Sequence, residues 1–570
     1  MPAGQAMLVT DAVAAALAGL GADTVFGVVG SGNFKVTNAL IGHGARYLAA
    51  RHECGAAVMA DAWARMSNRP GILSVHQGPG LTNALTGITE AAKSRTPLVV
   101  LAADVASSAV RSNFRIDVAS LATSVGAAAF RLHSPGFAVD DTVRAYRTAA
   151  QERRTVVLAL PLDVQAAECV LPAIEPIGPP PAVAPSADAV ASLAEALRRA
   201  RRPVFIAGRG TRIAGAGPDL ERLAARCGAL LATSAAGKGL FRGSPWDLDV
   251  SGGFASPLAA ELIRDADLVV GWGCSLNMWT LRHGKLIGPD AAVIQVDHDQ
   301  AAIGAHRPVR LGVTGDVAVT ARAVSDALDG DAGRDAPGGS GPAGDIQHGG
   351  DVGYWSAALR DRIAAEVRWR DVPYADESDD RRIDPRTLTI GLDDMLPAER
   401  TVAVDSGNFM GYPSMYLSVP DADGFCFTQA YQSIGLGLAS AIGSAIARPD
   451  RLTVAALGDG GALMGISELE TVVRLGLPMV IVVYDDEAYG AEVHHFGPDG
   501  DPLDTVRFPP ADIAEIGRGF GCAGVTVRST GDLGPVREWL DGPRERPLVI
   551  DAKVTSQHGS WWLEEAFRGH

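Results

Sequence analysis

Two groups of acidic residues lie close together in the C-terminal part of the chain, each directly after an apolar run. Gly458-Asp459-Gly460-Gly461 follows the run over 452–457, and Asp485-Asp486-Glu487 follows the run over 479–484. Carboxylates that act with carbonyl oxygens and water suit a hard cation such as Mg²⁺, which keeps phosphates as partners. The glycines would let a phosphate approach the backbone, and a helix N-terminus would favour its charge. A Gly-Asp-Gly turn alone would more often be an ordinary turn, but the second acidic group makes the pattern specific.

The elements around these residues are expected to bring the two acidic groups together. Residues 465–475 carry apolar side chains at helical spacing, and Gly476 and Pro478 end that helix. The stretch is therefore a strand–helix–strand unit with a right-handed crossover and parallel strands. Ligands of open α/β sheets bind at the carboxyl ends of the strands. Asp459 and Asp486 should lie at that edge, within reach of one ion.

The whole chain shows the same alternation of short apolar strands and helices, which predicts an α/β fold with mostly parallel sheets covered by helices on both faces. We expect three such domains, over 1–171, 187–329 and 384–570. In the central domain, strands are expected over 203–207, 230–233, 268–272 and 292–296. Residues 172–186 are proline-rich and predict an extended connection, and residues 330–383 are expected to form a second linker.

Composition excludes several classes of protein. The 570 residues carry a formal net charge of −16, which argues against nucleic acid or an anionic membrane as the main partner. Six cysteines are scattered without a C-x-x-C pair, which favours reduced thiols in a cytoplasmic protein. The N-terminus has no basic region typical of a signal peptide, and no uncharged run reaches membrane-spanning length.

Several motifs in this chain resemble those of thiamine-diphosphate (ThDP) enzymes of the acetolactate synthase-like group. The family's diphosphate motif opens with Gly-Asp-Gly, as here, and closes with Asn-Asn where this chain has Asp485-Asp486. Arg51-His52-Glu53 before an Ala-rich helix resembles the segment with the activating glutamate. The Gly-Pro-Gly loop within 76–91 and the segment 429–443 match further family segments. The resemblance covers nearly the whole chain and implies the three-domain ThDP-enzyme architecture.

The resemblance also implies site residues. Mg²⁺ would be held by Asp459, Asp486 and the carbonyl of Ala488, and we expect the aspartate in place of asparagine to preserve binding. Glu53 would hydrogen-bond the aminopyrimidine ring of ThDP, although such a residue could also serve only the helix dipole. Ile434 would bend the cofactor. The cofactor-binding set is completed by Gly407, Asn408, Gly458, Gly460, Gly461, Tyr489 and Gly490.

The substrate side of the site is less distinctive. Glu492 should lie where the substrate enters, where its carboxylate could act as acid or base; the alternative is a solvated loop residue. Ser31-Gly32-Asn33 occupies the loop in which some relatives carry a reactive histidine, which disfavours a dedicated histidine-assisted decarboxylase. In the central domain, glycine turns at 208–210 and 271–273 are weak signals for FAD or CoA/ADP, and Arg209, Lys238 and Arg282 could meet phosphates there.

These observations predict an enzyme that uses ThDP and Mg²⁺ to decarboxylate a small 2-oxo acid and join the product to an aldehyde or second oxo acid. Two alternatives remain: a 2-hydroxyacyl-CoA lyase, which Glu492 could serve by deprotonating a 2-hydroxyl, and an inactive ThDP-fold binding protein. The resemblance implies that Glu53 of one chain meets Asp459 of another. The active form should therefore be at least a homodimer, and a homotetramer is the common outcome in the family.

Overall fold

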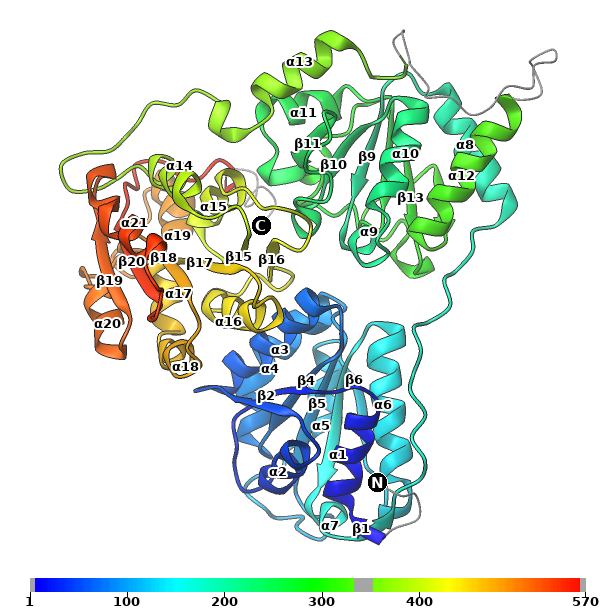
Figure 1. Cartoon of the computed structure of the whole chain (residues 1–570), viewed down its shortest axis with the longest axis vertical. Helices are drawn as coiled ribbons and strands as arrows, with labels where there is room; N and C mark the ends of the chain where they lie inside the picture. Colours follow the sequence, from blue (N-terminus) through cyan, green and yellow to red (C-terminus); the bar gives the residue numbers. More distant parts are fainter. Residues whose placement is uncertain (1–5, 333–351, 564–570) are drawn as a thin grey trace.

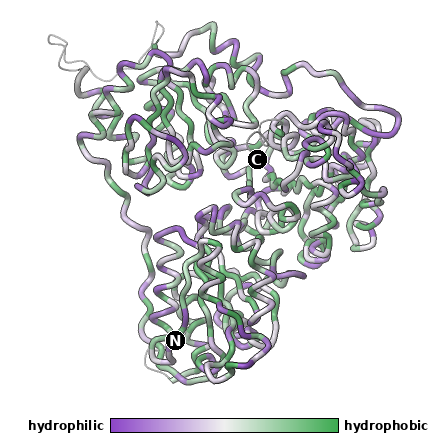
Figure 2. Tube along the Cα trace, turned by 180° about the vertical axis from the view of Figure 1, so that it is seen from behind, coloured by the Kyte–Doolittle hydropathy of each residue, from purple (hydrophilic) through white to green (hydrophobic). Residues whose placement is uncertain are grey.

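The computed structural model describes residues 6–332 and 352–563 and shows three lobes (Figure 1). Each lobe contains a six-stranded sheet in which every neighbouring pair of strands is parallel. The apolar segments follow the strands inside the lobes, as Figure 2 shows. The predicted α/β fold with parallel sheets is confirmed. Within the described residues, no helix is both long and apolar enough to cross a membrane.

The N-terminal sheet has the strand order β3-β2-β4-β5-β7-β6. Helices α1, α2 and α6 pack on one face and α3, α4 and α5 on the other. The chain goes from β2 outward to β3 and then returns to the other side of β2 as β4, so a crevice opens between the carboxyl ends of β2 and β4. The elements are β2 (Thr24–Gly27), β3 (Arg46–Ala49), β4 (Gly71–Val75), β5 (Leu98–Asp104), β6 (Ala128–Arg131), β7 (Thr155–Pro161), α1 (Val9–Gly19), α2 (Phe34–Gly42), α3 (Glu53–Ser67), α4 (Pro79–Lys93), α5 (Val118–Ser124) and α6 (Ala138–Glu152).

The central sheet repeats this topology with the order β11-β10-β9-β12-β13-β14 and its crevice between β9 and β12. Helices α8, α10 and α12 cover one face, and α11 and α13 (Ala357–Glu366) the other. The strands predicted over 203–207, 230–233 and 268–272 are confirmed. The elements are β9 (Pro203–Ala207), β10 (Leu230–Thr233), β11 (Asp247–Val250), β12 (Leu268–Trp272), β13 (Ala292–Asp297), β14 (Leu311–Thr314), α8 (Ala187–Arg199), α10 (Gly217–Cys227), α11 (Pro257–Arg264) and α12 (Val317–Ala332).

The C-terminal sheet has the order β16-β15-β17-β18-β20-β19, so its crevice lies between β15 and β17. Helices α16, α18 and α20 cover the face toward the N-terminal domain, and α14, α15 and α21 the other. The elements are β15 (Arg400–Val404), β16 (Phe425–Phe427), β17 (Leu452–Gly458), β18 (Met479–Asp485), β19 (Ala523–Val527), β20 (Leu548–Lys553), α14 (Pro385–Met395), α15 (Gly411–Tyr416), α16 (Gly437–Ala447), α18 (Glu468–Arg474), α20 (Ile513–Phe520) and α21 (Gly534–Asp541).

The segments between the domains differ in how they are held. Residues 172–186 form no helix or strand and run along the outside of the molecule (Figure 1). The segment 330–383, predicted as a linker, is partly structured: α13 (Ala357–Glu366) docks on the central domain, where Trp355 stacks on Trp246 at 4.4 Å between ring centroids. Residues 333–351 of that prediction lie outside the described residues. The hydrophilic stretch after α13 leads to the C-terminal domain (Figure 2).

Candidate active site

Asp459 and Asp486 lie next to each other at the carboxyl edge of the C-terminal sheet. Strands β17 and β18 are adjacent and parallel, with Gly458 paired to Tyr484 in the register. Asp459 and Asp486 therefore leave the sheet within one residue of the same level. Asp459 begins the short helix α17 (Asp459–Met464), and Gly465 separates α17 from α18. The single helix predicted over 465–475 is therefore shorter than expected and begins at Glu468.

The charges around this pair fit a bound cation. Burial and the like charge of neighbouring carboxylates raise the pKa of both Asp459 and Asp486. Neither carboxylate pairs with a Lys or Arg among the described residues, whereas the buried Asp485 contacts the Nζ of Lys553. Lys553 thus neutralises the charge of Asp485. The charge of Asp486 is left without a basic partner, at the place where a metal would bind. The described residues contain no cluster of three or more His, Cys, Asp or Glu side chains arranged as metal ligands.

The glycines beside the aspartates lie where a side chain would not fit. A Cβ on Gly490 would lie 2.4 Å from an Asp486 oxygen, and one on Gly460 would lie 2.6 Å from the ring of Tyr489. Real Cβ atoms essentially never make non-bonded contacts this short. The backbone of this turn is therefore held against the acidic pair, and the donors that remain fit Mg²⁺ and a diphosphate: two carboxylates and backbone groups.

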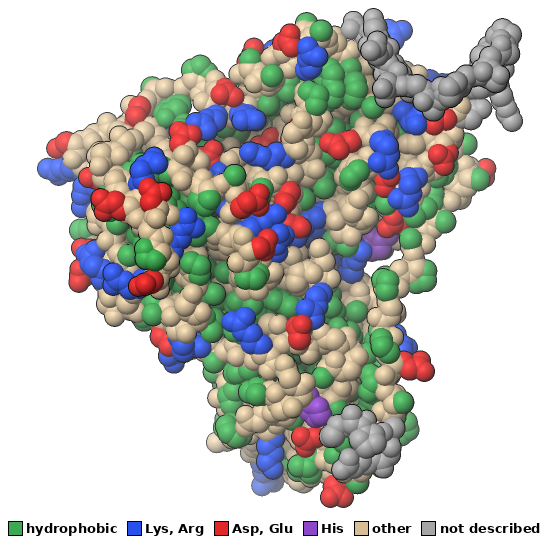
Figure 3. All heavy atoms as spheres, viewed as in Figure 1, with side chains coloured by type: hydrophobic (Ala, Val, Ile, Leu, Met, Phe, Trp, Pro, Cys, Tyr) green, Lys and Arg blue, Asp and Glu red, His purple; other side chains and the backbone are tan. Residues whose placement is uncertain are grey.

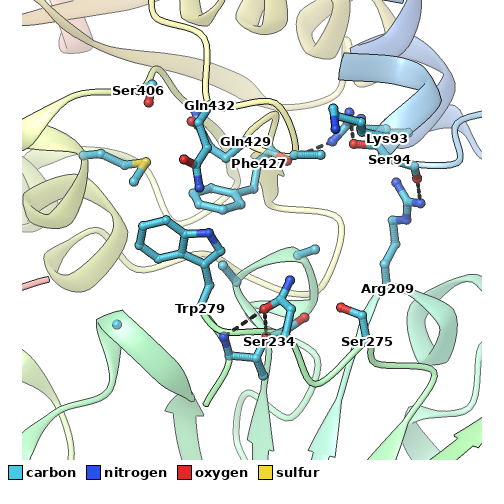
Figure 4. Close-up of a pocket in the computed structure, with 18 of the residues that line it drawn as sticks. Lys93, Ser94, Arg209, Ser234, Ser275, Trp279, Ser406, Phe427, Gln429 and Gln432 are labelled. Atoms are coloured by element: carbon cyan, nitrogen blue, oxygen red, sulfur yellow. Dashed lines mark hydrogen bonds between the residues drawn. The ribbon is translucent and has the colours of Figure 1, made fainter. Parts of the chain in front are cut away.

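A cavity of about 1380 Å³ extends from these residues to the central domain. Figure 4 shows Trp279 of the central domain facing Phe427 and Gln429 of the C-terminal domain, and Arg209 reaching Ser94 of the N-terminal domain. The cavity is lined by all the C-terminal residues that the sequence predicted for the site: Gly407, Asn408, Ile434, Gly458, Asp459, Gly460, Gly461, Asp486, Ala488, Tyr489, Gly490 and Glu492.

Glu53 lies elsewhere and does not line this cavity. It begins α3 after β3, is partly buried, and accepts a hydrogen bond of 3.1 Å from the Nδ2 of Asn83. The loop before it is fixed by the buried Glu468, whose carboxylate accepts the backbone N–H groups of Arg51 and His52 at 3.0 and 3.1 Å. One chain therefore carries two separate groups of predicted site residues.

Comparison with known proteins identifies the family. Three models of the thiamine pyrophosphate enzymes match: the N-terminal TPP-binding domain over 7–121, the central domain over 190–324 and the C-terminal TPP-binding domain over 405–552. A probable 2-ketoarginine decarboxylase of Pseudomonas aeruginosa is 30% identical, over 91% of this chain and 88% of that protein. The chain belongs to the thiamine pyrophosphate enzymes.

Other relatives have different activities. A sulfoacetaldehyde acetyltransferase of Castellaniella defragrans is 28% identical over 99% of this chain and 96% of its own length. The large subunit of acetolactate synthase isozyme 2 of Escherichia coli is 27% identical over 83% of this chain and 82% of its own length. The protein is thus a ThDP-dependent enzyme of the acetolactate synthase, decarboxylase and acetyltransferase family.

In this ThDP enzyme, a buried aspartate that the sequence analysis missed positions Ile434. Asp405 follows β15 and accepts the backbone N–H groups of Gly435 and Leu436 at 3.0 and 3.1 Å. Burial raises the pKa of Asp405 to about 6. The sequence does show Asp405 directly after a buried strand, as it shows Asp459. Its hydrogen-bond partners lie about 30 residues away along the chain, so no local pattern indicated its role. Lys553 was missed for the same reason.

Asn408, which the sequence predicts to bind the cofactor, also makes two hydrogen bonds within the chain. Its side-chain oxygen accepts the backbone N–H of Ser560 at 2.8 Å, and its carbonyl accepts the indole N–H of Trp562 at 3.1 Å. Trp562 is buried and packs near Trp279 of the central domain. Asn408 thus fixes the segment around Trp562 over one wall of the cavity, and its amide oxygen is already used.

The remaining polar candidates divide clearly. The partly buried carboxylate of Glu492 lines the cavity on α19 (Gly490–Phe496) and has no hydrogen-bond or ion-pair partner in the described part of the chain. Lys238 and Arg282 do not line the cavity. Lys238 donates to the backbone carbonyl of Ser414, and Arg282 donates to those of Gly252 and Ala255. Of the three basic residues predicted to meet phosphates, only Arg209 reaches the cavity.

Proposed function

We propose that this ThDP enzyme uses Mg²⁺ to decarboxylate a small 2-oxo acid and to join the product to an aldehyde or a second oxo acid. The proposal is carried by the acidic pair of the buried Asp459 and the half-buried Asp486, which lacks a Lys or Arg partner among the described residues and opens on the large cavity. Together with the carbonyl of Ala488, these residues would hold the metal on the diphosphate. Ile434, positioned by Asp405, would support the bent cofactor.

ThDP, when bound, would supply the nucleophilic carbon and the electron sink that the loss of a carboxylate needs. The residues of the chain have simpler tasks. Glu53 would hold a proton at its carboxylate and exchange it with the aminopyrimidine ring. Glu492 would hold or move a proton at the substrate oxygen on the opposite side of the site. Trp279, Phe427 and Trp562 would keep water from the cavity.

The separation of Glu53 from the cavity supports a site shared between two chains. A two-fold arrangement would bring the Glu53 group of one chain against the Asp459 group of its partner, and would do so twice at one self-complementary interface. We therefore propose a homodimer as the smallest active form and a homotetramer as the assembled one, acting in the cytoplasm.

A second candidate, a 2-hydroxyacyl-CoA lyase, is favoured by the far end of the cavity. There the glycine turn at Gly210 packs on Gly273, with a backbone hydrogen bond of 3.0 Å, at the crevice of the central sheet. Burial and the nearby Arg65 lower the pKa of the Arg209 guanidinium, whose hydrogen bond goes to the carbonyl of Ser94. A bound anionic group would relieve the repulsion between Arg209 and Arg65, and a phosphate of CoA, ADP or FAD could be that group.

Calorimetry with ThDP and Mg²⁺ on two variants tests the metal assignment. Asp459→Ala should lose Mg²⁺-dependent ThDP binding, because a carboxylate beside the diphosphate is removed. Asp486→Asn should retain binding, since the amide oxygen remains a ligand. Loss in Asp486→Asn with retention in Asp459→Ala would contradict the assignment. Assays of the wild type with pyruvate, 2-ketoarginine and a 2-hydroxyacyl-CoA then separate the two activities.

A further inference from the structure

One residue of the cavity wall has a backbone conformation that only glycine adopts easily. Gln432 has a φ of 61°, in the left-handed region where the Cβ of other residues lies too close to a carbonyl oxygen. Two further residues that line the cavity share this conformation for ordinary reasons: Arg153 is the C-cap of α6, and Arg95 pairs with Asp299 at 2.7 Å. Gln432 caps no helix, since α16 begins only at Gly437.

Hydrogen bonds on both sides of Gln432 impose this conformation. On the N-terminal side, the buried carboxylate of Glu90 in α4 accepts the backbone N–H groups of Ala430 and Tyr431 at 3.1 and 2.7 Å. On the C-terminal side, Asp405 holds the turn that follows. Strained residues persist only where the surrounding structure holds them, and they gather at functional sites. The two carboxylates therefore fix the place at which the side chain of Gln432 leaves the backbone.

The side chain of Gln432 gives the chain nothing in return for this strain. It is exposed and makes no hydrogen bond with any described residue. The side-chain amides of Gln429 and Asn408, which line the same cavity, each hydrogen-bond within the chain. Figure 4 shows Gln432 beside Gln429, across the cavity from Trp279. The amide of Gln432 is thus free to meet a molecule in the cavity.

The chemistry of this wall favours a carboxylate as the group that Gln432 binds. Among the described residues, no Lys or Arg of the C-terminal domain lines the cavity, and Arg65 of the N-terminal domain is tied to Asp61 and Glu90. The free amide can donate through Nε2. A neutral donor also suits a carboxylate that must leave as CO₂, because a cation would stabilise the charged ground state more than a transition state in which that charge disperses.

We propose that Gln432 is a substrate-binding residue, whose side-chain amide donates a hydrogen bond to the carboxylate of the 2-oxo acid. The inference rests on the proposed function and names the group that recognises the acid. The contact is made with the bound substrate and is lost as the carboxylate leaves. Gln432 therefore acts on KM more than on kcat.

Three variants separate substrate binding from a role in the fold. Gln432→Gly relieves the backbone and removes the amide, whereas Gln432→Glu keeps the length of the side chain and the backbone strain but has no N–H. Asn68→Gly is the matched control, because Asn68 has a φ of 55° at the C-cap of α3 and does not line the cavity. The probe is whichever of pyruvate, 2-oxobutyrate and 2-ketoarginine gives the wild type its highest kcat/KM.

We expect Gln432→Gly to melt at the wild-type temperature or above it and yet to lose about 10–100-fold in kcat/KM, mainly through KM. Gln432→Glu should lose at least as much, and Asn68→Gly should keep the wild-type kcat/KM. Calorimetry should give all three variants the wild-type affinity for ThDP with Mg²⁺. A rise in melting temperature or none, together with a loss of substrate binding, is a result that a merely structural role would not produce.

Several outcomes would overturn the inference. These are a Gln432→Gly variant that keeps more than a third of wild-type kcat/KM, a melting temperature that falls together with activity, a loss that follows ThDP affinity, or a Gln432→Glu variant with the wild-type KM. Each of them would leave the proposed function standing. Wild type that binds no ThDP, or that turns over none of the three 2-oxo acids, would overturn the proposed function as well.

Discussion

At the scale of single residues, two consecutive aspartates have opposite environments. Asp485 is buried against Lys553, which also pairs with Asp551 at 3.0 Å. Asp486 turns toward the cavity and has Asp459 as its neighbour. A buried charge without a partner is costly, and here the protein neutralises one carboxylate and leaves the other free to meet the proposed metal. This division explains how the motif can carry two aspartates where the family has two asparagines.

Glu53→Gln should remove most of the activity and leave ThDP binding intact. The amide can still hydrogen-bond a ring nitrogen, but it cannot accept and return a proton, and such transfers contribute about 10²–10⁴ in rate. Steady-state kinetics give the loss, and calorimetry with ThDP and Mg²⁺ gives the affinity. Full turnover by this variant would show that Glu53 only serves the start of α3.

Asp405 should make stability depend on pH. Its folded pKa of about 6 lies above the unfolded value of about 3.9. A carboxylate with a raised folded pKa contributes stability below its unfolded pKa and loses it as the pH rises through about 6. Relative to Asp405→Asn, the wild type should therefore lose on the order of 3 kcal/mol between pH 4 and pH 7. Denaturant unfolding of both proteins measures this difference, and a constant difference across that range would refute the raised pKa.

At the scale of elements, α3 and α16 join the N- and C-terminal domains into one continuous core. The helices lie side by side in Figure 1. At Gly443 of α16 the two helices are too close for a side chain. A Cβ there would lie 2.3 Å from the carbonyl oxygen of Met59 in α3. The same α3 begins with Glu53, so this packing also fixes the position of the carboxylate that we propose to be catalytic.

Gly443→Ala should destabilise the protein by about 1–3 kcal/mol, because the added methyl forces α3 and α16 apart. Gly519→Ala is the matched control: Gly519 is also helical, in α20, and a Cβ there would have nothing within 4 Å. That variant should be neutral or more stable by up to about 1 kcal/mol. Thermal unfolding measures the stability of both variants. Equal melting temperatures would mean that α3 and α16 are not tightly packed at Gly443.

At the scale of the whole molecule, the predicted site residues of one chain form two separate groups. Asp459 and its neighbours open on the cavity between the domains, while Glu53 lies at the crevice of the N-terminal sheet. Acidic and basic side chains are interspersed on the face shown in Figure 3. The proposed pairing of two chains would bring each half against its complement.

Mixing two inactive variants tests this pairing. Glu53→Gln and Asp459→Ala chains, mixed equally and allowed to exchange, should recover about a quarter of wild-type activity, because half the dimers are mixed and each has one intact site. Each variant incubated alone is the control. Proven exchange without recovery, or a fully active monomer by light scattering, would exclude the shared site.

The sequence by itself determined the parallel α/β domains and the place of the acidic motif, because strand and helix periodicities and a motif within 30 residues are local patterns. The predicted C-terminal site residues do meet at one cavity, since strand ends share an edge. Only the tertiary structure decided that Lys553 neutralises Asp485, that Asn408 holds the segment around Trp562, and that the backbone N–H of Gly32 donates to His76. Each of these pairs joins residues far apart in the chain, and no local pattern encodes which distant partner a buried polar group will meet.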